Sequence, residues 1–148
     1  LIQDADGEYN PADIPLLLHA LDEGTDAVFG SRNLAPTGRG YWRYVVGAAL
    51  LTGIANMLYG SRLTDVYTGY KLVRRKALSA CHLQANGFAF EAEVTAELLR
   101  RGARIREIPI RYTPRSFSEG KKIRGRDAFI GAWTLIARRC RSKLAMLG

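Results

Sequence analysis

The sequence predicts an α/β domain, and three features of its first thirty residues indicate it. An apolar stub at residues 1–3 runs into acidic residues and is typical of a short strand. Apolar residues then recur at helical spacing from Ile14 to Leu21, and a second short apolar run spans residues 26–30. A strand, a helix and a strand in this order form a parallel α/β unit.

The first helix has clear start and stop signals. Asn10 offers a capping side chain, Pro11 suits the first helical position, and Gly24 is expected to end the helix. Residues 33–40 contain two glycines and a proline and are typical of a loop, either a lid or a connector.

A long helix is predicted from Trp42 to Tyr59. The uncharged run 44–61 has 18 residues, the lower limit for crossing a bilayer. Small or polar residues form a stripe along it, at positions 49, 53, 56 and 60, beside an apolar stripe. This pattern favours a packed or interfacial helix over a membrane span.

The rest of the chain alternates between strands and helices. Residues 63–73 are predicted to form a turn that enters a strand, 74–80 a short helix and 90–101 a longer one. Residues 104–112 alternate as a strand does, and Pro109 favours an edge or bulged position. An amphipathic helix is predicted over residues 127–139.

The net charge of +8 comes from the last quarter of the chain. Residues 1–110 hold 12 basic and 12 acidic residues, whereas residues 111–148 hold 10 basic residues against Glu119 and Asp127. Such an excess favours an anionic partner: a membrane surface, a phosphorylated ligand or a nucleic acid. The two cysteines lie far apart, which fits a reduced cytosolic protein better than a disulfide framework.

Asp4 and Asp6 are the first candidates for chemistry. Alternation along an extended backbone places both carboxylates on one side, where they can share a divalent cation and leave positions open for phosphates. The alternative is an Asx-turn and a helix cap, which the same residues suit. The carboxyl ends of the strands are where ligands of α/β sheets bind, and Arg32 is expected there as well.

Several blocks along the chain together resemble the family 2 inverting glycosyltransferases, in particular the polyprenyl-phosphate, dolichol-phosphate mannose synthase-like branch. The blocks are Gln3–Gly7, Gly30–Arg32, Asp65–Lys71, Phe90–Glu93, Ile105–Tyr112 and Arg115–Lys121. The resemblance implies the C-terminal portion of a GT-A fold, with a mixed sheet flanked by helices and the N-terminal nucleotide-binding half missing. It also implies a partial catalytic domain at residues 1–127, followed at 128–148 by a basic amphipathic helix suited to a membrane interface.

The resemblance implies a metal and a donor for the acidic block. Asp6 is expected to bind Mg²⁺ or Mn²⁺ directly, with Asp4 near the metal or the ribose of a nucleotide-diphosphate sugar. Glu8 departs from the glutamine frequent in this branch, and as a carboxylate it is a third candidate ligand. The cation would neutralise the diphosphate leaving group.

The acceptor end of the site is expected among later residues. The resemblance places a candidate catalytic base at Asp65. Arg32, Arg115, Ser118 and Lys121 are candidate substrate-binding residues, since basic side chains bind phosphate. A lipid phosphate is largely ionised at neutral pH and needs positioning, whereas a sugar hydroxyl needs a base.

The leading hypothesis is sugar transfer with inversion to a polyprenyl phosphate by a cytoplasmic protein that is peripherally associated with the membrane. One rival keeps the fold and uses a glycan hydroxyl as acceptor. Another is a non-catalytic module that binds membranes or nucleic acid through its basic quarter, although charge alone does not explain the acidic blocks. Nucleic acid is therefore not an expected partner, and self-association is left open.

Overall fold

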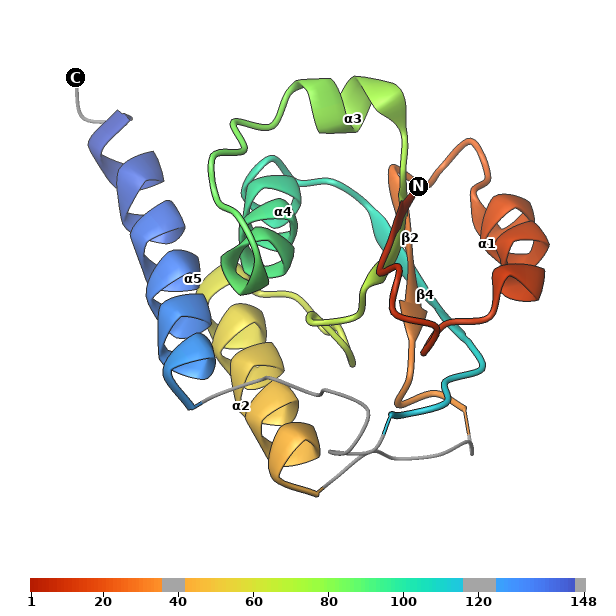
Figure 1. The fold of residues 1–148 in the computed structure, drawn as a ribbon. Helices are drawn as coiled ribbons and strands as arrows, with labels where there is room; N and C mark the ends of the chain where they lie inside the picture. Colours follow the sequence, from red (N-terminus) through yellow and green to blue (C-terminus); the bar gives the residue numbers. More distant parts are fainter. Residues whose placement is uncertain (36–41, 116–124, 146–148) are drawn as a thin grey trace.

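A computed structural model describes residues 1–35, 42–115 and 125–145. Within these ranges the chain forms a mixed four-stranded sheet with helices on both faces, so the predicted α/β class is confirmed (Figure 1). In chain order the elements are β1 (Ile2–Gln3), η1 (Pro11–Asp13), α1 (Ile14–Ala20), β2 (Ala27–Ser31), α2 (Trp42–Tyr59), β3 (Tyr70–Val73), α3 (Arg75–Ser79), α4 (Phe88–Arg100), β4 (Ile105–Pro109) and α5 (Gly125–Ala145).

The strand order of the sheet is β1-β3-β2-β4. β3 is antiparallel to both β1 and β2, whereas β2 and β4 are parallel. β1 and β2 therefore run in the same direction, as the predicted α/β unit requires, but β3 lies between them. Pro109 closes β4 at one edge of the described sheet, which agrees with its inability to donate a ladder hydrogen bond.

The first helix begins as predicted and ends earlier than predicted. The Asn10 side chain accepts a hydrogen bond from the Ala12 amide at 2.9 Å and caps the 3₁₀ turn that leads into α1. The helix ends at Ala20, not at Gly24, because the chain turns at Asp22. The Asp22 carboxylate accepts hydrogen bonds from the Gly24 amide and the Thr25 hydroxyl, and these bonds replace the last helical turn.

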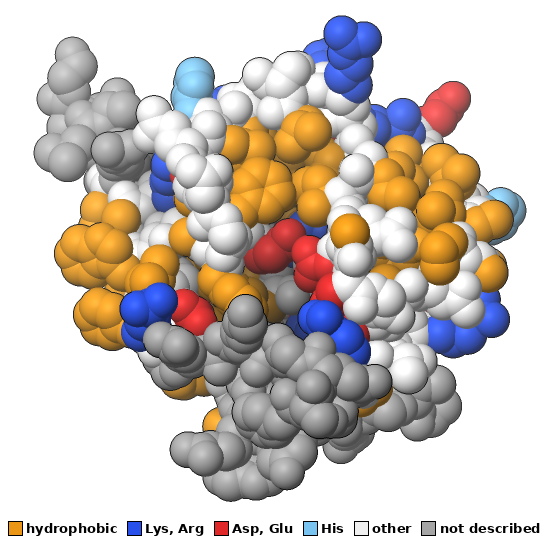
Figure 2. Space-filling view, in the orientation of Figure 1, with side chains coloured by type: hydrophobic (Ala, Val, Ile, Leu, Met, Phe, Trp, Pro, Cys, Tyr) orange, Lys and Arg blue, Asp and Glu red, His pale blue; other side chains and the backbone are white. Residues whose placement is uncertain are grey.

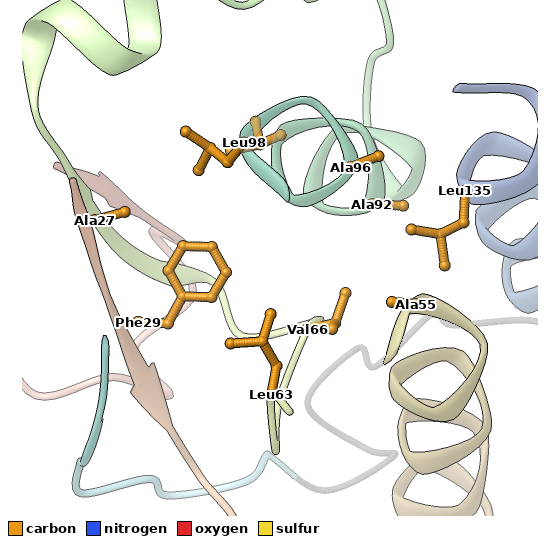
Figure 3. Close-up of a cluster of buried hydrophobic side chains, with 10 residues drawn as sticks. Ala27, Phe29, Ala55, Leu63, Val66, Ala92, Ala96, Leu98 and Leu135 are labelled. Carbon is orange, nitrogen blue, oxygen red and sulfur yellow. The ribbon is translucent and has the colours of Figure 1, made fainter. Parts of the chain in front are cut away.

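Two apolar clusters fill the two faces of the sheet. On one face α1 packs on a cluster that contains Leu17, Val28 and Tyr70. On the other face Phe29 and its neighbours meet α2, α4 and α5, and Figure 3 shows Leu135 of α5 pointing into this cluster. Apolar burial on both faces fixes the strand register, because a shift by one residue would turn each side chain to the other face.

The C-terminal helix α5 packs against α4 and α2. The position between residues 127 and 128, where the sequence suggested a boundary, lies inside α5. Leu135 is fully buried, and the Tyr59 hydroxyl donates to its carbonyl oxygen at 2.8 Å. In the part of the chain that the structure describes, no helix is both long and apolar enough to cross a membrane.

Candidate functional site

The acidic residues after β1 lie in a turn that faces the chain between α2 and β3. The Asp4 amide donates to the Gly69 carbonyl at 3.1 Å, and the Asp6 carboxylate accepts from the Glu8 amide at 3.0 Å. The predicted Asx-turn is thus present at Asp6, while the helix cap is Asn10. Figure 2 shows acidic side chains gathered in the middle of the face of the molecule that it displays, next to basic side chains.

Asp4 lies directly against Gly69. A Cβ atom at position 69 would overlap the Asp4 carboxylate, so the contact requires glycine there. Burial raises the pKa of Asp4 above its usual value, and the negative charges of Glu91 and Asp6 raise it further. Lys71 and Arg32 act in the opposite direction, and a bound cation would lower the pKa of Asp4 further.

Arg115 joins the acidic turn from the chain that follows β4. Its guanidinium donates to Asp6 at 2.9 Å, and its backbone amide donates to Glu8 at 2.9 Å. The other Glu8 oxygen accepts from the Tyr112 hydroxyl at 2.6 Å, and Glu8 is buried. Glu8 therefore anchors the 112–115 segment to the acidic turn.

Arg32 and Asp65 form a second ion pair at the carboxyl end of β2. The Arg32 guanidinium donates to both Asp65 oxygens, at 2.7 and 2.8 Å, and the Arg32 amide donates to one of them at 3.1 Å. Asp65 is almost fully buried. Burial works to lower the pKa of Arg32, but the Asp65 carboxylate outweighs it and raises that pKa.

The Glu107 carboxylate of β4 binds the backbone of the turn that contains Asp65. One of its oxygens accepts from the Thr64 amide at 2.7 Å and the other from the Asp65 amide at 2.9 Å. Burial raises the pKa of Glu107, and these hydrogen bonds lower it in part. Sequence reasoning assigned Glu107 no role, because its place in an alternating strand gives no sign that its carboxylate binds a turn over forty residues away.

The structure brings most of the predicted site residues to one region, in two groups. Asp6, Glu8 and Arg115 make one group, with Asp4 against Gly69 beside it, and Arg32 with Asp65 makes the other. Arg32 also lies over the ring of Tyr112, 5.2 Å from its centroid, so Tyr112 touches both groups. Ser118 and Lys121 lie outside the described residues.

Lys71 and Tyr9 also belong to this region, although sequence reasoning did not select them as site residues. The Lys71 ammonium is buried and paired with Glu91, and the Tyr9 hydroxyl accepts from the Gly69 amide at 2.8 Å. Burial raises the pKa of Tyr9 to about 12, so it is neutral at physiological pH. A lysine inside a strand that is otherwise apolar was the available signal for Lys71.

Asp4 and Asp6 are the candidate residues for a divalent cation. Within residues 1–35, 42–115 and 125–145, no three His, Cys, Asp or Glu side chains form a group that could hold a metal by themselves. Two carboxylates beside a guanidinium instead fit a cation that shares its remaining ligands with a substrate diphosphate. Glu8 is buried, with both oxygens in hydrogen bonds, so it fits this role less well than the two aspartates, which are more exposed.

Comparison with known proteins assigns the chain to a class. Residues 1–81 match the glycosyl transferase family 2 domain, and the chain belongs to this family. The family predicted from the sequence is thus confirmed. The mixed sheet and its helices are consistent with part of the GT-A fold.

Two of its relatives carry names that refer to a polyprenol or undecaprenyl phosphate. The chain is 32% identical over 123 residues to a polyprenol monophosphomannose synthase of Mycolicibacterium smegmatis, covering 80% of this chain and 46% of that protein. It is 34% identical over 128 residues to an undecaprenyl-phosphate mannosyltransferase of Micrococcus luteus, covering 80% and 50%. The glycosyltransferase AglJ of Haloferax volcanii is 30% identical, covering 78% and 38%. The chain spans about half the length of the first two relatives.

Proposed function

We propose that the protein containing this chain transfers a sugar from a nucleotide-diphosphate donor to a polyprenyl phosphate, with inversion at the sugar carbon. The observation that carries the proposal is the ion pair of Arg115 with Asp6, whose negative charge also acts on Asp4. Carboxylates suit a divalent cation on the donor diphosphate, and a guanidinium suits phosphate oxygens. The names of the relatives favour a mannosyl donor and a polyprenyl phosphate acceptor.

In this proposal Asp4 and Asp6 hold Mg²⁺ or Mn²⁺ together with the donor diphosphate. When bound, the cation supplies charge neutralisation for the leaving diphosphate. When substrate enters, Arg115 leaves Asp6 and binds a substrate phosphate. Ser118 and Lys121, which follow Arg115 in the chain, are further candidates for binding phosphate. Glu8 keeps the 112–115 segment in place for this contact.

The state of Asp65 favours a phosphate acceptor over a hydroxyl acceptor. A hydroxyl nucleophile needs a carboxylate that is free to take its proton. Both Asp65 oxygens instead accept hydrogen bonds from Arg32, in a buried ion pair. A lipid phosphate is already ionised and needs no base to remove a proton. It needs a positioned cationic side chain, and Asp65 holds Arg32 in place for this role. Transfer to a glycan hydroxyl, with Asp65 as the base, is the second candidate function.

Membrane association is part of the proposal, because the acceptor is a lipid. Large apolar side chains are exposed on α2 and α5, which pack against each other; they are Val46, Leu50, Met57, Phe129, Ile130, Trp133 and Ile136. Aromatic and basic residues together on a helix suit the headgroup boundary of a bilayer. We therefore propose peripheral attachment to the cytoplasmic face of a membrane through these residues.

The activity test uses Mn²⁺ or Mg²⁺, radiolabelled nucleotide sugars and polyprenyl phosphate, with the lipid product measured by extraction. Asp6→Asn is expected to lower turnover by about 100-fold or more, because a charge that stabilises the transition state is lost. Glu23→Gln, which neutralises an exposed acid in the turn after α1, is the matched control and should keep turnover within about 2-fold. Equal activity of the parent and Asp6→Asn, or no product with any donor, would contradict the proposal.

A further inference from the structure

Lys71 is a fully buried lysine in an interior strand of the described sheet. It lies opposite Ile2 of β1 and Phe29 of β2, and its side chain is 0% exposed. Its strand neighbours Tyr70 and Leu72 pack on the α1 face, so Lys71 points to the α4 face. An ammonium group in such a place is costly unless it is paired.

The Lys71 ammonium connects the turn before β3 to the start of α4. It donates to the Thr68 carbonyl and to the Glu91 carboxylate, and it lies 5.1 Å from the centroid of the Phe29 ring. Glu91 belongs to the first turn of α4 and is largely buried. The pair therefore ties the Thr68–Gly69 turn to a helix that packs on the body of the domain.

The Thr68–Gly69 turn is also the surface on which Asp4 rests. The Gly69 carbonyl accepts from the Asp4 amide, and the bare Gly69 Cα leaves room for the Asp4 carboxylate. On the opposite side, the Gly69 amide donates to the Tyr9 hydroxyl. A shift of this turn would therefore move the Asp4 carboxylate.

Stability alone does not account for a buried charged pair at this point, since apolar residues of similar volume are often equally stable or more so. We propose that Lys71 and Glu91 are positioning residues, which hold the Thr68–Gly69 turn and through it orient the Asp4 carboxylate toward the divalent cation. The inference rests on the metal role in the proposed function. Lys71 and Glu91 themselves touch neither metal nor substrate in it.

The test replaces the pair with apolar residues in Lys71→Met/Glu91→Leu. A matched control, Arg138→Met/Glu93→Leu, removes another buried ion pair of α4, on the side that faces α5. A third variant, Lys71→Arg, keeps a cation that can donate to both Thr68 and Glu91. The readouts are Mn²⁺ affinity by electron paramagnetic resonance, amide hydrogen exchange of residues 67–70, and the melting temperature.

Lys71→Met/Glu91→Leu is expected to bind Mn²⁺ about 10-fold more weakly, as loss of an outer-shell partner typically does, and to exchange the amides of 67–70 faster. The Mn²⁺ affinity of Lys71→Arg should stay within about 3-fold of that of the parent. The control pair should leave the Mn²⁺ affinity and the amide exchange of 67–70 at the parent values. Parent-like Mn²⁺ affinity in Lys71→Met/Glu91→Leu would overturn the inference. If that variant does not fold, Glu91→Gln takes its place, with the same two outcomes.

Failure of the inference can be told apart from failure of the proposed function. If the parent protein itself binds no Mn²⁺, the metal role of Asp4 and Asp6 is wrong. Amide exchange of residues 67–70 then decides whether the pair holds the turn: unchanged exchange in Lys71→Met/Glu91→Leu overturns that part, and faster exchange supports it.

Discussion

At the scale of single residues, two aspartates that each pair with an arginine lie in different environments. Asp6 and its partner Arg115 are both partly exposed, whereas Asp65 is buried and bound to Arg32 through both oxygens. The environment of Asp6 suits a residue that binds a ligand, and that of Asp65 suits a residue that holds Arg32 in place. These environments, more than the residue type, determine which acid can meet a substrate.

Asp65→Asn tests which acceptor the enzyme uses. With a phosphate acceptor, we expect a loss of about 10- to 100-fold, because Arg32 loses its support but no base is removed. Arg32→Ala should lower turnover by a similar factor. The double variant should be about as active as the less active of the two single variants, since both substitutions break the same ion pair. Steady-state kinetics with polyprenyl phosphate measure this. Complete loss in Asp65→Asn with near-normal turnover in Arg32→Ala would favour Asp65 as a base.

Sequence reasoning selected residues that the structure brings to one region, but it did not predict which of them pair. Asp4, Asp6, Arg32 and Arg115 stand beside strand ends or turns, which local patterns reveal. The contact of Arg115 with Asp6 joins residues 109 positions apart, and nothing local encodes it. The pairing of Asp65 with Arg32 was missed for the same reason.

At the scale of elements, the bounds of α2 were predicted well, those of α1 and α5 less well, and the order of the strands was not predicted. The prediction for α2, Trp42–Tyr59, coincides with the structure, because an apolar pattern and flanking glycines are local signals. The insertion of β3 between β1 and β2 depends on pairing across more than forty residues. Not all of the basic excess of the last quarter of the chain is exposed, because Arg138 pairs with Glu93 and Glu97 of α4 and is largely buried.

Two glycines in helices should respond to alanine in opposite ways. A Cβ at Gly131 of α5 would overlap the Tyr67 hydroxyl, whereas a Cβ at Gly53 of α2 would meet no atom within 4 Å. Gly53→Ala should raise the free energy of unfolding by about 0.5–1 kcal/mol, since alanine is the better helix former. Gly131→Ala should lower it by about 1–3 kcal/mol through overpacking. Urea unfolding measures both, and a stabilised Gly131→Ala would contradict the close packing of α5 on Tyr67.

The attachment of α4 to its surroundings should depend on pH through Glu97. Burial would raise the pKa of Glu97, but hydrogen bonds from Arg100 and the His82 amide outweigh it and lower that pKa below its usual 4.5. A lowered pKa means that the folded state favours the charged form, so the contribution to stability is present above pH 4.5 and is lost as the pH falls through the lowered value.

Glu97→Gln makes this contribution measurable. At pH 7 the variant should be about 2 kcal/mol less stable than the parent, because hydrogen bonds to a charged group are lost. The difference should shrink as the pH falls below 4.5, because Glu97 in the parent then becomes neutral as well. Urea unfolding of both proteins from pH 3 to 7 checks this, and a difference that does not change with pH would contradict it.

At the scale of the whole molecule, the two faces of the sheet carry helices with different exposed surfaces. α1 lies on one face, and α2, α4 and α5 lie on the other (Figure 1). Exposed apolar side chains occur on both faces, but the aromatic ones of α5, Phe129 and Trp133, are 74% and 63% exposed. The proposed membrane contact therefore belongs to the α5 side.

Phe129→Ser/Trp133→Ser is expected to weaken binding to vesicles of anionic lipid by about 10-fold or more, because two large apolar groups no longer enter the interface. Leu16→Ser/Leu18→Ser, at two exposed positions of α1, is the matched control and should leave binding unchanged. Co-sedimentation with vesicles measures both variants. An equal loss in the two variants would indicate non-specific apolar adsorption instead of a membrane contact at α5.

The position of β3 also has a consequence for the order of assembly during synthesis. β1 is made before β3, so its partner in the described sheet is complete only when residue 73 has been added. At about 5–20 residues per second, the β1 segment waits several seconds on the ribosome for that partner. The acidic turn therefore depends on closure of a loop of more than sixty residues, and we expect it to form late in folding, after α1 and α2.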